Sequence, residues 1–393
     1  MSTANKKVMV VGGGIAGLTA AWELSQLNID VELIEKTCFL GGYAIQFCCK
    51  ATDECVTCGA CSAEDMLYNV VNEPKIKVHL ATEIEKINKN GKLSVSLKKS
   101  SPQTDSAEGG LAKGYSKNNS PLLVVVDKSS CKKIPDGAVA FDDIELVNKI
   151  DDIDAVVLAS GFNPFNAEIK GTYGYHKFNN VVTGLDLERI IRKNGVVVRP
   201  SDGKEPKAVA FIQCVGSRDE NLGNLWCSQV CCPYALRMAE QTKYKNPDTD
   251  ITVFYMDIQN AGKNFPVFYE KCKSDMRFVR NIPVDLYPIK GDKLQMRYMN
   301  DDDGLSVKEV FDMVVLSIGI MPGSDNVQLS ELLDINLNQD GFFACKDKFN
   351  RTSTSKDGIF IAGTVQGPKT IAASMAHATQ AAGEVMKYLG VSK

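Results

Sequence analysis

Residues 7–35, KVMVVGGGIAGLTAAWELSQLNIDVELIE, decide how this chain folds. An apolar run leads into a glycine turn, a helix-like run and a second apolar run, which is the order of one βαβ unit. Gly12, Gly14 and Gly17 give the pattern G-x-G-x-x-G at the turn, and Glu35 ends the second strand. The glycines would let a pyrophosphate approach the helix N-terminus, and the carboxylate would accept the ribose hydroxyls. The stretch therefore predicts a dinucleotide site.

Bulk composition limits the class of protein. A chain of 393 residues is long enough for two or three domains. Its 45 Lys and Arg balance 48 Asp and Glu, so the net charge of -3 indicates an ordinary surface and no nucleic-acid partner. Two lysines before an apolar run imitate a secretory signal, but three glycines interrupt that run. No apolar stretch reaches the ~20 residues of a membrane span. We expect a cytoplasmic protein.

A second βαβ-like block follows further along the chain. Its strands are expected in AVAFIQC (208–214), ITVFYMDI (251–258) and DMVVLSIGIMP (312–322), and the chain closes with GIFIAGT (358–364) and a long helix over 371–389. Strands are also expected within 76–98 and 121–147. The predicted fold is α/β with two Rossmann-like dinucleotide-binding domains. We place the first at 1–165 and 323–393, with a cysteine-rich insertion at about 47–66 and a mobile loop at about 100–120, and the second at 203–322.

The first site is expected to hold FAD. LGG at 40–42, DAVVLASG at 154–161 and GIFIAGT resemble motifs of flavoproteins with two dinucleotide domains, although Thr364 stands where these often have Asp. The helix after GPKT could support negative charge on a reduced flavin. Lys369 would lie near the ring if a resemblance to a flavoprotein family holds, and an exposed loop lysine is the alternative. The predicted cofactor-binding residues are Gly12, Gly14, Ala16, Gly17, Glu35, Lys36, Gly41, Gly42, Ala159, Ser160, Gly161, Gly363, Thr364, Gly367, Lys369, Thr370 and Ile371.

Thirteen cysteines are many for one chain, and eight of them form two groups. The first cysteine group, Cys49, Cys55, Cys58 and Cys61, has the spacing C-x5-C-x2-C-x2-C. Consecutive C-x2-C steps can reach separate iron corners of a [4Fe-4S] cubane, whereas a structural zinc ion usually draws on two separate pairs. The spacing favours an iron–sulfur cluster over zinc. Cys48 or a more distant cysteine is the alternative to Cys49 as the fourth ligand.

The second cysteine group is Cys214, Cys227, Cys231 and Cys232. It follows a predicted strand where an NAD(P)H-binding domain would carry a glycine-rich loop, yet only Gly216 is present. The group indicates a second [4Fe-4S] cluster in place of a nicotinamide site. Cys232 is the least secure ligand because adjacent side chains diverge in extended backbone. The alternative is a dithiol of Cys227 with Cys231 or Cys232 that exchanges with disulfides.

The three histidines, His79, His176 and His377, are isolated in the sequence, and each is expected to be a packing or surface residue.

Five stretches carry a family resemblance: VGGGIAGLTAA, RPSDGKEPKAVAFIQCVGSRD, CSQVCCPYA, FYMDIQNAGKNF and GIFIAGTVQGPKTI. Together they resemble the A subunit of heterodisulfide reductase. The chain lacks the extra ferredoxin-type cysteine repeats of the longer methanogen proteins. It is more similar to compact forms, such as the A subunit of the quinone-interacting oxidoreductase of sulfate reducers or the related subunit of class II benzoyl-CoA reductase.

The resemblance implies an anaerobic electron-transfer subunit with FAD, two [4Fe-4S] clusters and partner subunits, in some members with flavin-based bifurcation. Two alternatives stay open at this point. One is a stand-alone FAD-dependent thiol–disulfide reductase, and the other is a zinc-bearing interaction scaffold with a vestigial flavin site.

Overall fold

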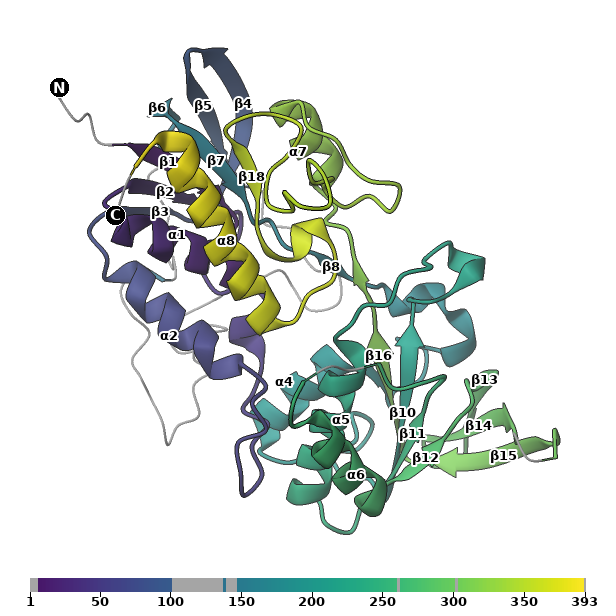
Figure 1. The fold of residues 1–393 in the computed structure, drawn as a ribbon. Helices are drawn as coiled ribbons and strands as arrows, with labels where there is room; N and C mark the ends of the chain where they lie inside the picture. Colours follow the sequence, from purple (N-terminus) through teal and green to yellow (C-terminus); the bar gives the residue numbers. More distant parts are fainter. Residues whose placement is uncertain (1–5, 101–136, 139–146, 260–261, 301–302, 392–393) are drawn as a thin grey trace. The chain divides into compact units, whose positions relative to one another are not determined.

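The computed structural model describes residues 6–100, 137–138, 147–259, 262–300 and 303–391, and the chain forms two compact units (Figure 1). Unit 1 comprises Met1–Phe47, Gly59–Asn163 and Pro322–Lys393, and unit 2 comprises Cys48–Cys58 and Pro164–Met321. The loop expected at 100–120 and the strands expected within 121–147 lie outside the described residues, except for positions 100, 137, 138 and 147.

Unit 1 is built on a five-stranded parallel sheet in the order β18-β7-β1-β2-β3. β1 lies at its centre, with Val8 opposite Val31 on one side and Ala155 on the other. The glycine turn after β1 therefore lies at the carboxyl edge of the sheet, where nucleotides bind in folds of this kind. The strands are β1 (Lys7–Val11), β2 (Asp30–Ile34), β3 (Ile76–His79), β7 (Ala155–Leu158) and β18 (Ile359–Ile361).

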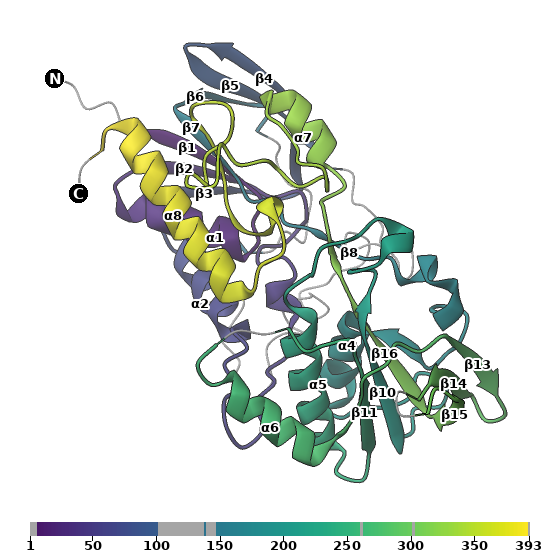
Figure 2. The ribbon, with the colours of Figure 1, turned by 45° about the vertical axis from the view of Figure 1, so that its right-hand side comes forward.

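Both faces of this sheet are covered. Three helices share one apolar core with it: α1 (Ile15–Gln26), α2 (Ala60–Val71) and α8 (Ile371–Leu389). Figure 2 shows α1 and α8 side by side. The other face packs on the antiparallel strands β4 (Thr82–Asn90), β5 (Lys92–Lys99) and β6 (Lys149–Ile153) and on α7 (Asn326–Leu333). The helix expected over 371–389 is confirmed, and α2 begins early enough to include Cys61.

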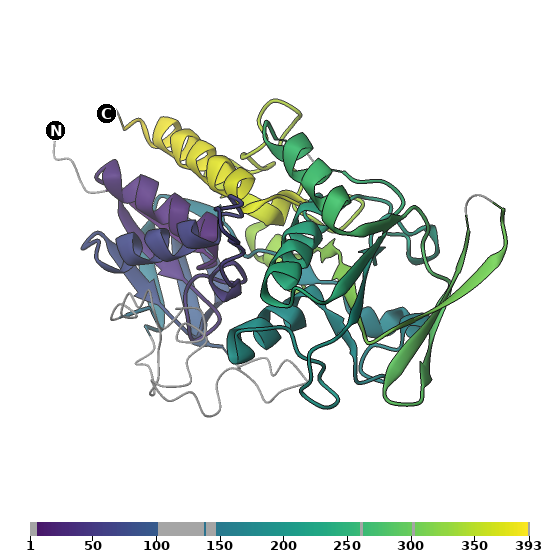
Figure 3. The same cartoon turned by 90° about the horizontal axis from the view of Figure 1, so that it is seen from below.

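Unit 2 repeats the plan with a parallel sheet in the order β12-β11-β10-β16-β9. Its strands are β9 (Val181–Thr183), β10 (Ala208–Val215), β11 (Asp250–Phe254), β12 (Arg277–Val279) and β16 (Met313–Ile318). One face carries α4 (Gly184–Asn194), α5 (Cys231–Lys245) and α6 (Phe265–Asp275). The other packs on the antiparallel strands β13 (Asp285–Ile289), β14 (Lys293–Met299) and β15 (Ser306–Phe311), the light-green ribbons of Figure 3. The short strands β8 (Asn163–Pro164) and β17 (Ile320–Met321) pair with each other.

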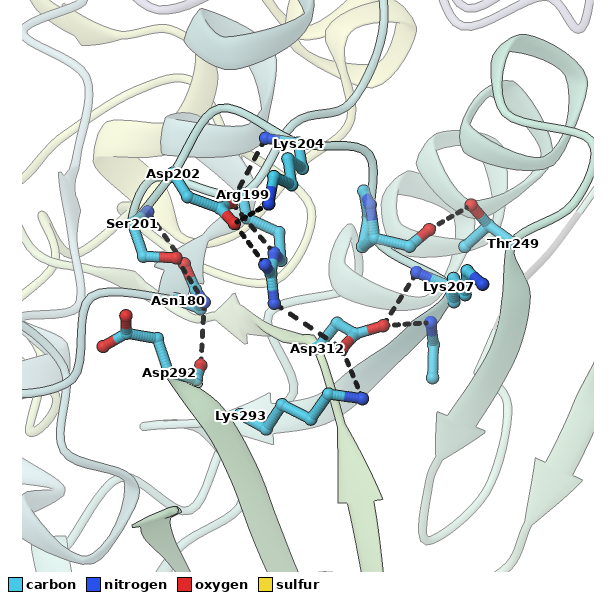
Figure 4. Close-up of polar contacts among 12 residues, drawn as sticks. Asn180, Arg199, Ser201, Asp202, Lys204, Lys207, Thr249, Asp292, Lys293 and Asp312 are labelled. Atoms are coloured by element: carbon cyan, nitrogen blue, oxygen red, sulfur yellow. Dashed lines mark hydrogen bonds and ion pairs between the residues drawn. The ribbon is translucent and has the colours of Figure 1, made fainter. Parts of the chain in front are cut away.

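Asp312 fastens the amino-terminal edge of this second sheet (Figure 4). Its buried carboxylate accepts hydrogen bonds from the backbone N–H of Lys207 at 2.8 Å and of Ala208 at 3.1 Å, just where β10 begins. Lys293 adds an ion pair at 3.2 Å. Burial opposes ionisation, but these donors and the lysine charge hold the pKa of Asp312 below its usual value. The carboxylate stays charged and ties β10, β14 and β16 together.

Residues 48–58 interrupt unit 1 in the sequence and pack within unit 2. Glu188 on α4 holds the start of the segment, because one carboxylate oxygen accepts from the Cys48 N–H at 2.8 Å and the other pairs with Lys50. Both charged side chains are 2% exposed. The sequence expectation attached this segment to the first domain. A charge pair this deeply buried is what fastens it to the second unit instead.

Candidate functional site

The three glycines after β1 have different roles in the expected dinucleotide site. A Cβ on Gly12 would lie 2.3 Å from the Ala159 carbonyl oxygen, and one on Gly17 would lie 1.8 Å from the Gly12 carbonyl oxygen. A Cβ on Gly14 would meet no heavy atom within 4 Å. Gly12 and Gly17 are therefore required by the packing of the chain itself, whereas Gly14 borders open space where a ligand can approach the backbone.

Glu35 lies under this turn at the end of β2. One carboxylate oxygen accepts from the Gly13 N–H at 2.6 Å and the other from the Thr37 N–H at 2.7 Å. Burial raises the pKa of Glu35, while the N–H donors of Thr37 and Gly13 act against that rise. A carboxylate has further lone pairs, so the group can fix the glycine turn and still accept ribose hydroxyls.

The carboxyl ends of β1 and β7 also present polar groups suited to a ligand. The Ser160 hydroxyl is buried and finds no hydrogen-bond partner among the described residues. A Cβ on Gly161 would meet open space. Gly41 forms an isolated bridge with Gly14, which brings the expected Gly41–Gly42 pair against the glycine turn. An orphaned hydroxyl beside a cradle of open glycines fits a bound dinucleotide.

Several of the remaining expected flavin residues lie around the start of α8. Lys369 donates to the Gln366 side chain at 2.6 Å, and burial lowers the pKa of Lys369 to about 8, with the charge of Arg351 acting in the same direction. Thr370 caps α8 by accepting from the Ala373 N–H at 3.1 Å. Two more of the expected residues make packing contacts: Ala16 lies against Gly363, and Ile371 lies against Gly59. Lys36 forms an ion pair with Asp325 at 2.9 Å. Thr364 lies in the turn Gly363–Gln366, and the following Gly367 borders open space.

His377 is the residue of this region that sequence reasoning undervalued. Its ring nitrogen Nδ1 accepts from the Gly363 N–H at 3.0 Å, so it fixes the turn that leads into α8. Burial lowers the pKa of His377 to about 4, and the charge of Lys369 adds to this effect. A neutral ring is thus held in place. The sequence feature that could have indicated this role is the position of His377, about two turns into the helix that follows an expected flavin motif.

The second cysteine group gathers at the carboxyl edge of the unit 2 sheet. Cys214 is the penultimate residue of β10 and has a left-handed φ of 58°, and Cys231 and Cys232 open α5. Burial raises the pKa of Cys231, and the charges of Cys214, Cys232 and Cys227 raise it further. The same pattern of burial and neighbouring thiols raises the pKa of Cys214 to about 11. Cys231 and Cys214 thus lie near the other thiols of the group.

The backbone and the neighbouring polar groups determine how these thiols are presented. Cys231 and Cys232 occupy a helical turn, where neighbouring side chains are about 100° apart, so the divergence of extended backbone does not apply. The Gln229 N–H lies 3.3 Å from the Cys227 sulfur, with Gln229 in a left-handed conformation. Ser217 and Gln213 nearby on the chain are buried, and their side-chain polar atoms have no partners among the described residues. Such donors can serve cluster or thiolate sulfurs.

A nicotinamide site would require an open glycine loop after β10, but the space beside Gly216 in this loop is not open. A Cβ on Gly216 would lie 2.1 Å from the ring of Phe165, so an aromatic side chain already fills the space beside this glycine. Cys214 lines a cavity of about 190 Å³, together with Lys170, Tyr173 and Arg218 among others. Lys170 and Arg218 are each paired with a carboxylate, Asp219 and Asp257 respectively.

The first cysteine group is divided between the units. Cys49, Cys55 and Cys58 belong to unit 2, and Cys61 lies in α2 of unit 1. The Thr57 N–H lies 3.4 Å from the Cys55 sulfur, and Thr57 has a φ of 48°, so this turn repeats the local arrangement at Cys227. Across the described ranges, no three His, Cys, Asp or Glu side chains converge as ligands of a single metal ion. A cubane takes one thiolate at each of four separate irons, and its ligands stand further apart.

Within the described residues, no helix combines the length and the apolar character needed to cross a bilayer.

Comparison with known proteins gives the chain its relatives. Residues 10–56 match the family of NAD(P)-binding Rossmann-like domains. The second iron-sulfur A subunit of the CoB–CoM heterodisulfide reductase of Methanopyrus kandleri is 32% identical over 96% of this chain and 63% of its own length. The corresponding A subunit from Methanocaldococcus jannaschii is 32% identical over 97% of this chain and 64% of its own length. The chain thus spans under two thirds of these relatives.

Solved structures support the fold. The thioredoxin reductase of Lactococcus lactis matches 98% of this chain and 99% of its own with a TM-score of 0.57 at 14% identity. That of T. acidophilum matches 98% and 99% with a TM-score of 0.56 at 15% identity. The predicted two-domain, thioredoxin reductase-like α/β fold is confirmed. The resemblance seen in the sequence is confirmed as well, since the curated homologues are A subunits of heterodisulfide reductases.

Proposed function

We propose that this homologue of the heterodisulfide reductase A subunit is an oxidoreductase component that carries FAD and two [4Fe-4S] clusters and passes electrons between them and partner subunits. The observation that carries the proposal is the second cysteine group. Cys214 near the end of β10 and Cys231 and Cys232 at the start of α5 lie at the carboxyl edge of a parallel sheet, where a Rossmann-like domain binds its ligand, while Phe165 fills the space beside the one glycine of the loop. Cysteine ligands there favour a cluster over a nicotinamide.

The residues of unit 1 that would hold the FAD are those around the glycine turn. Gly14 leaves room for the pyrophosphate at the start of α1, Glu35 keeps the turn in shape and accepts ribose hydroxyls, and the α8 N-terminus favours negative charge. Lys369 is proposed to lie beside the ring. Bound flavin supplies the chemistry of exchanging either one or two electrons. The chain's own contribution is to bind and orient it.

The eight cysteines of the two groups are the proposed cluster ligands, with Cys48 as the alternative to Cys49. Partner subunits that contain iron–sulfur or heterodisulfide reductase-like domains are proposed as electron donors and acceptors, in an anaerobic cytoplasm. Flavin-based bifurcation would be an extension of the same role. NAD(P)H binding to this chain is not expected, because the second unit offers no open phosphate cradle among its described residues.

Iron and acid-labile sulfide analysis of anaerobically prepared protein tests the proposal. Cys231→Ser should lower the iron content by about four atoms, the content of one cubane, and leave FAD bound in unit 1. Cys272→Ser is the matched control, because Cys272 is a buried free cysteine of unit 2 outside both groups. Thiol–disulfide reduction would replace this function if the wild-type protein contained no iron and Cys231→Ser lost only disulfide turnover. Zinc without iron would favour the scaffold.

A further inference from the structure

Helix α5 contacts both cysteine groups. It begins with Cys231 and Cys232, two members of the second group. Further along, Gln241 donates through Nε2 to the Cys49 carbonyl, and the Cys48 sulfur lies 3.5 Å from the Gln241 side-chain oxygen. Arg237 donates through Nε to the Val56 carbonyl at 3.0 Å. Arg237 and Gln241 are four residues apart and so lie on one face of the helix. That face holds the segment 48–58.

The helix also fixes a spacing. A rise of 1.5 Å per residue puts Arg237 about 7.5 Å and Gln241 about 13.5 Å along the axis from Cys232. All of these residues lie in unit 2, together with Cys49, Cys55 and Cys58. The thiols at the start of α5 and the backbone groups bonded to its middle are therefore held by one rigid element.

The carbonyl that Arg237 binds lies inside the turn Cys55-Val56-Thr57-Cys58. Thr57 adopts a φ of 48°, a conformation that is costly for a β-branched residue, on the order of 1 kcal/mol or more. Such a turn persists only when its surroundings impose it. The Arg237 guanidinium is half-buried, its interaction with the Val56 carbonyl is charge-assisted, and the ring of Phe268 lies 5.9 Å beneath it.

We propose that Arg237 is the positioning residue of the first cysteine group: from α5 it holds the Cys55–Cys58 turn in the conformation that presents both thiols to a cluster, and it thereby sets the spacing of the two groups. The proposal rests on the proposed function for the identity of the cluster. The hold on the turn itself is a property of the protein and can be measured without metal.

The simpler account of Arg237 is a half-buried arginine that satisfies a loop carbonyl. Both accounts predict some loss of stability when it is removed. Only a positioning role predicts that the effect is concentrated on the Cys55–Cys58 turn, where the partly buried Cys58 reports it, and alters the spectrum of one cluster. The test therefore compares three variants: Arg237→Gln removes the cation, Arg237→Lys keeps it, and Arg189→Gln removes a solvent-exposed arginine from the neighbouring helix α4.

The first measurement uses full-length protein stripped of metal under reducing conditions. Peptide mapping by mass spectrometry follows the rate at which iodoacetamide alkylates each cysteine. In Arg237→Gln the rate at the partly buried Cys58 should rise about tenfold or more, since a charge-assisted hydrogen bond is lost, with Arg237→Lys in between, whereas Cys55 is already exposed and should change little. Cys345 of unit 1 and all thiols of Arg189→Gln should react as in wild type. A rate at Cys58 within about twofold of wild type in Arg237→Gln would overturn the proposal.

The second measurement uses anaerobically prepared holoprotein and low-temperature EPR. Arg237→Gln should lose or shift the signal of one reduced cluster and keep the other, and Arg237→Lys should restore most of it. Unchanged signals from both clusters would also overturn the positioning role. If wild type contains no iron, the proposed function fails, while the alkylation rates still decide whether Arg237 holds the turn.

Discussion

The buried pair of Lys50 and Glu188 gives the sharpest test of how residues 48–58 are held. Lys50→Met removes the cation and leaves the Glu188 carboxylate buried with the Cys48 N–H as its other partner. Breaking a buried pair from one side costs about 3–5 kcal/mol. The exposed pair of Lys204 and Asp202, also in unit 2 and 3.8 Å apart, is worth at most about 1 kcal/mol. Lys204→Met is therefore the matched control.

Unfolding of unit 2 can be followed by itself, because the two tryptophans of the chain lie one in each unit. In a Trp22→Phe background, the fluorescence of Trp226, whose indole N–H donates to the Ile320 carbonyl at 3.0 Å, reports on unit 2. With a urea m-value of about 2 kcal/mol/M, Lys50→Met should lower the midpoint by roughly 1.5–2.5 M.

Adding Glu188→Gln should recover part of this loss, because the uncompensated charge disappears while the amide oxygen can still accept from Cys48. A midpoint for Lys50→Met equal to that of Lys204→Met would refute the argument that this pair fastens the segment to unit 2.

Three further predictions concern the nucleotide-binding regions. Gly14→Glu should fold but lose the flavin absorbance, whereas Gly17→Ala should fail to fold, since only the second places a Cβ 1.8 Å from a carbonyl oxygen; full flavin in Gly14→Glu would contradict the site. The pKa of His377 is lowered from 6.5 to about 4, so the folded state cannot take up the proton that the unfolded state binds, and stability falls as the pH drops from about 6.5 to 4. His377→Gln should flatten this part of the melting-temperature profile, and an unchanged acid slope would rule out the histidine as its source. NADH alone should not rapidly reduce the flavin of the isolated chain, as stopped-flow absorbance would reveal, because Phe165 fills the space beside Gly216.

Much of unit 1 could be predicted from local sequence. The glycine turn, the strand before it and the helix over 371–389 depend on contacts and periodicities that span few residues. The roles of the separate glycines could not be read in this way. Only the positions of Ala159 and of the Gly12 carbonyl distinguish Gly12 and Gly17, which the backbone requires, from Gly14, which faces open space.

The attachment of residues 48–58 was beyond sequence reasoning for a physical reason. It depends on Glu188 and Gln241, which lie well over one hundred residues further along the chain. No periodicity marks a lysine that will be buried, and Lys50 in isolation reads as a surface residue. His377 was likewise read as an isolated side chain, because its partner is a backbone N–H of another segment.

The interleaving of the two units has a consequence for how the polypeptide is made on the ribosome. Unit 1 needs β18 and α8, which are synthesised after the final segment of unit 2 has ended at Met321. Domains fold as their chain becomes available, so unit 2 can close first and capture residues 48–58 while the nascent first unit is still without its last strand and helix. Capture at that stage closes a loop of more than one hundred residues between the two segments of unit 2. The entropic cost of closing this loop therefore falls on the folding of unit 2, before unit 1 forms. The cysteine segment 48–58 is therefore packed into unit 2 before the proposed flavin site of unit 1 is completed.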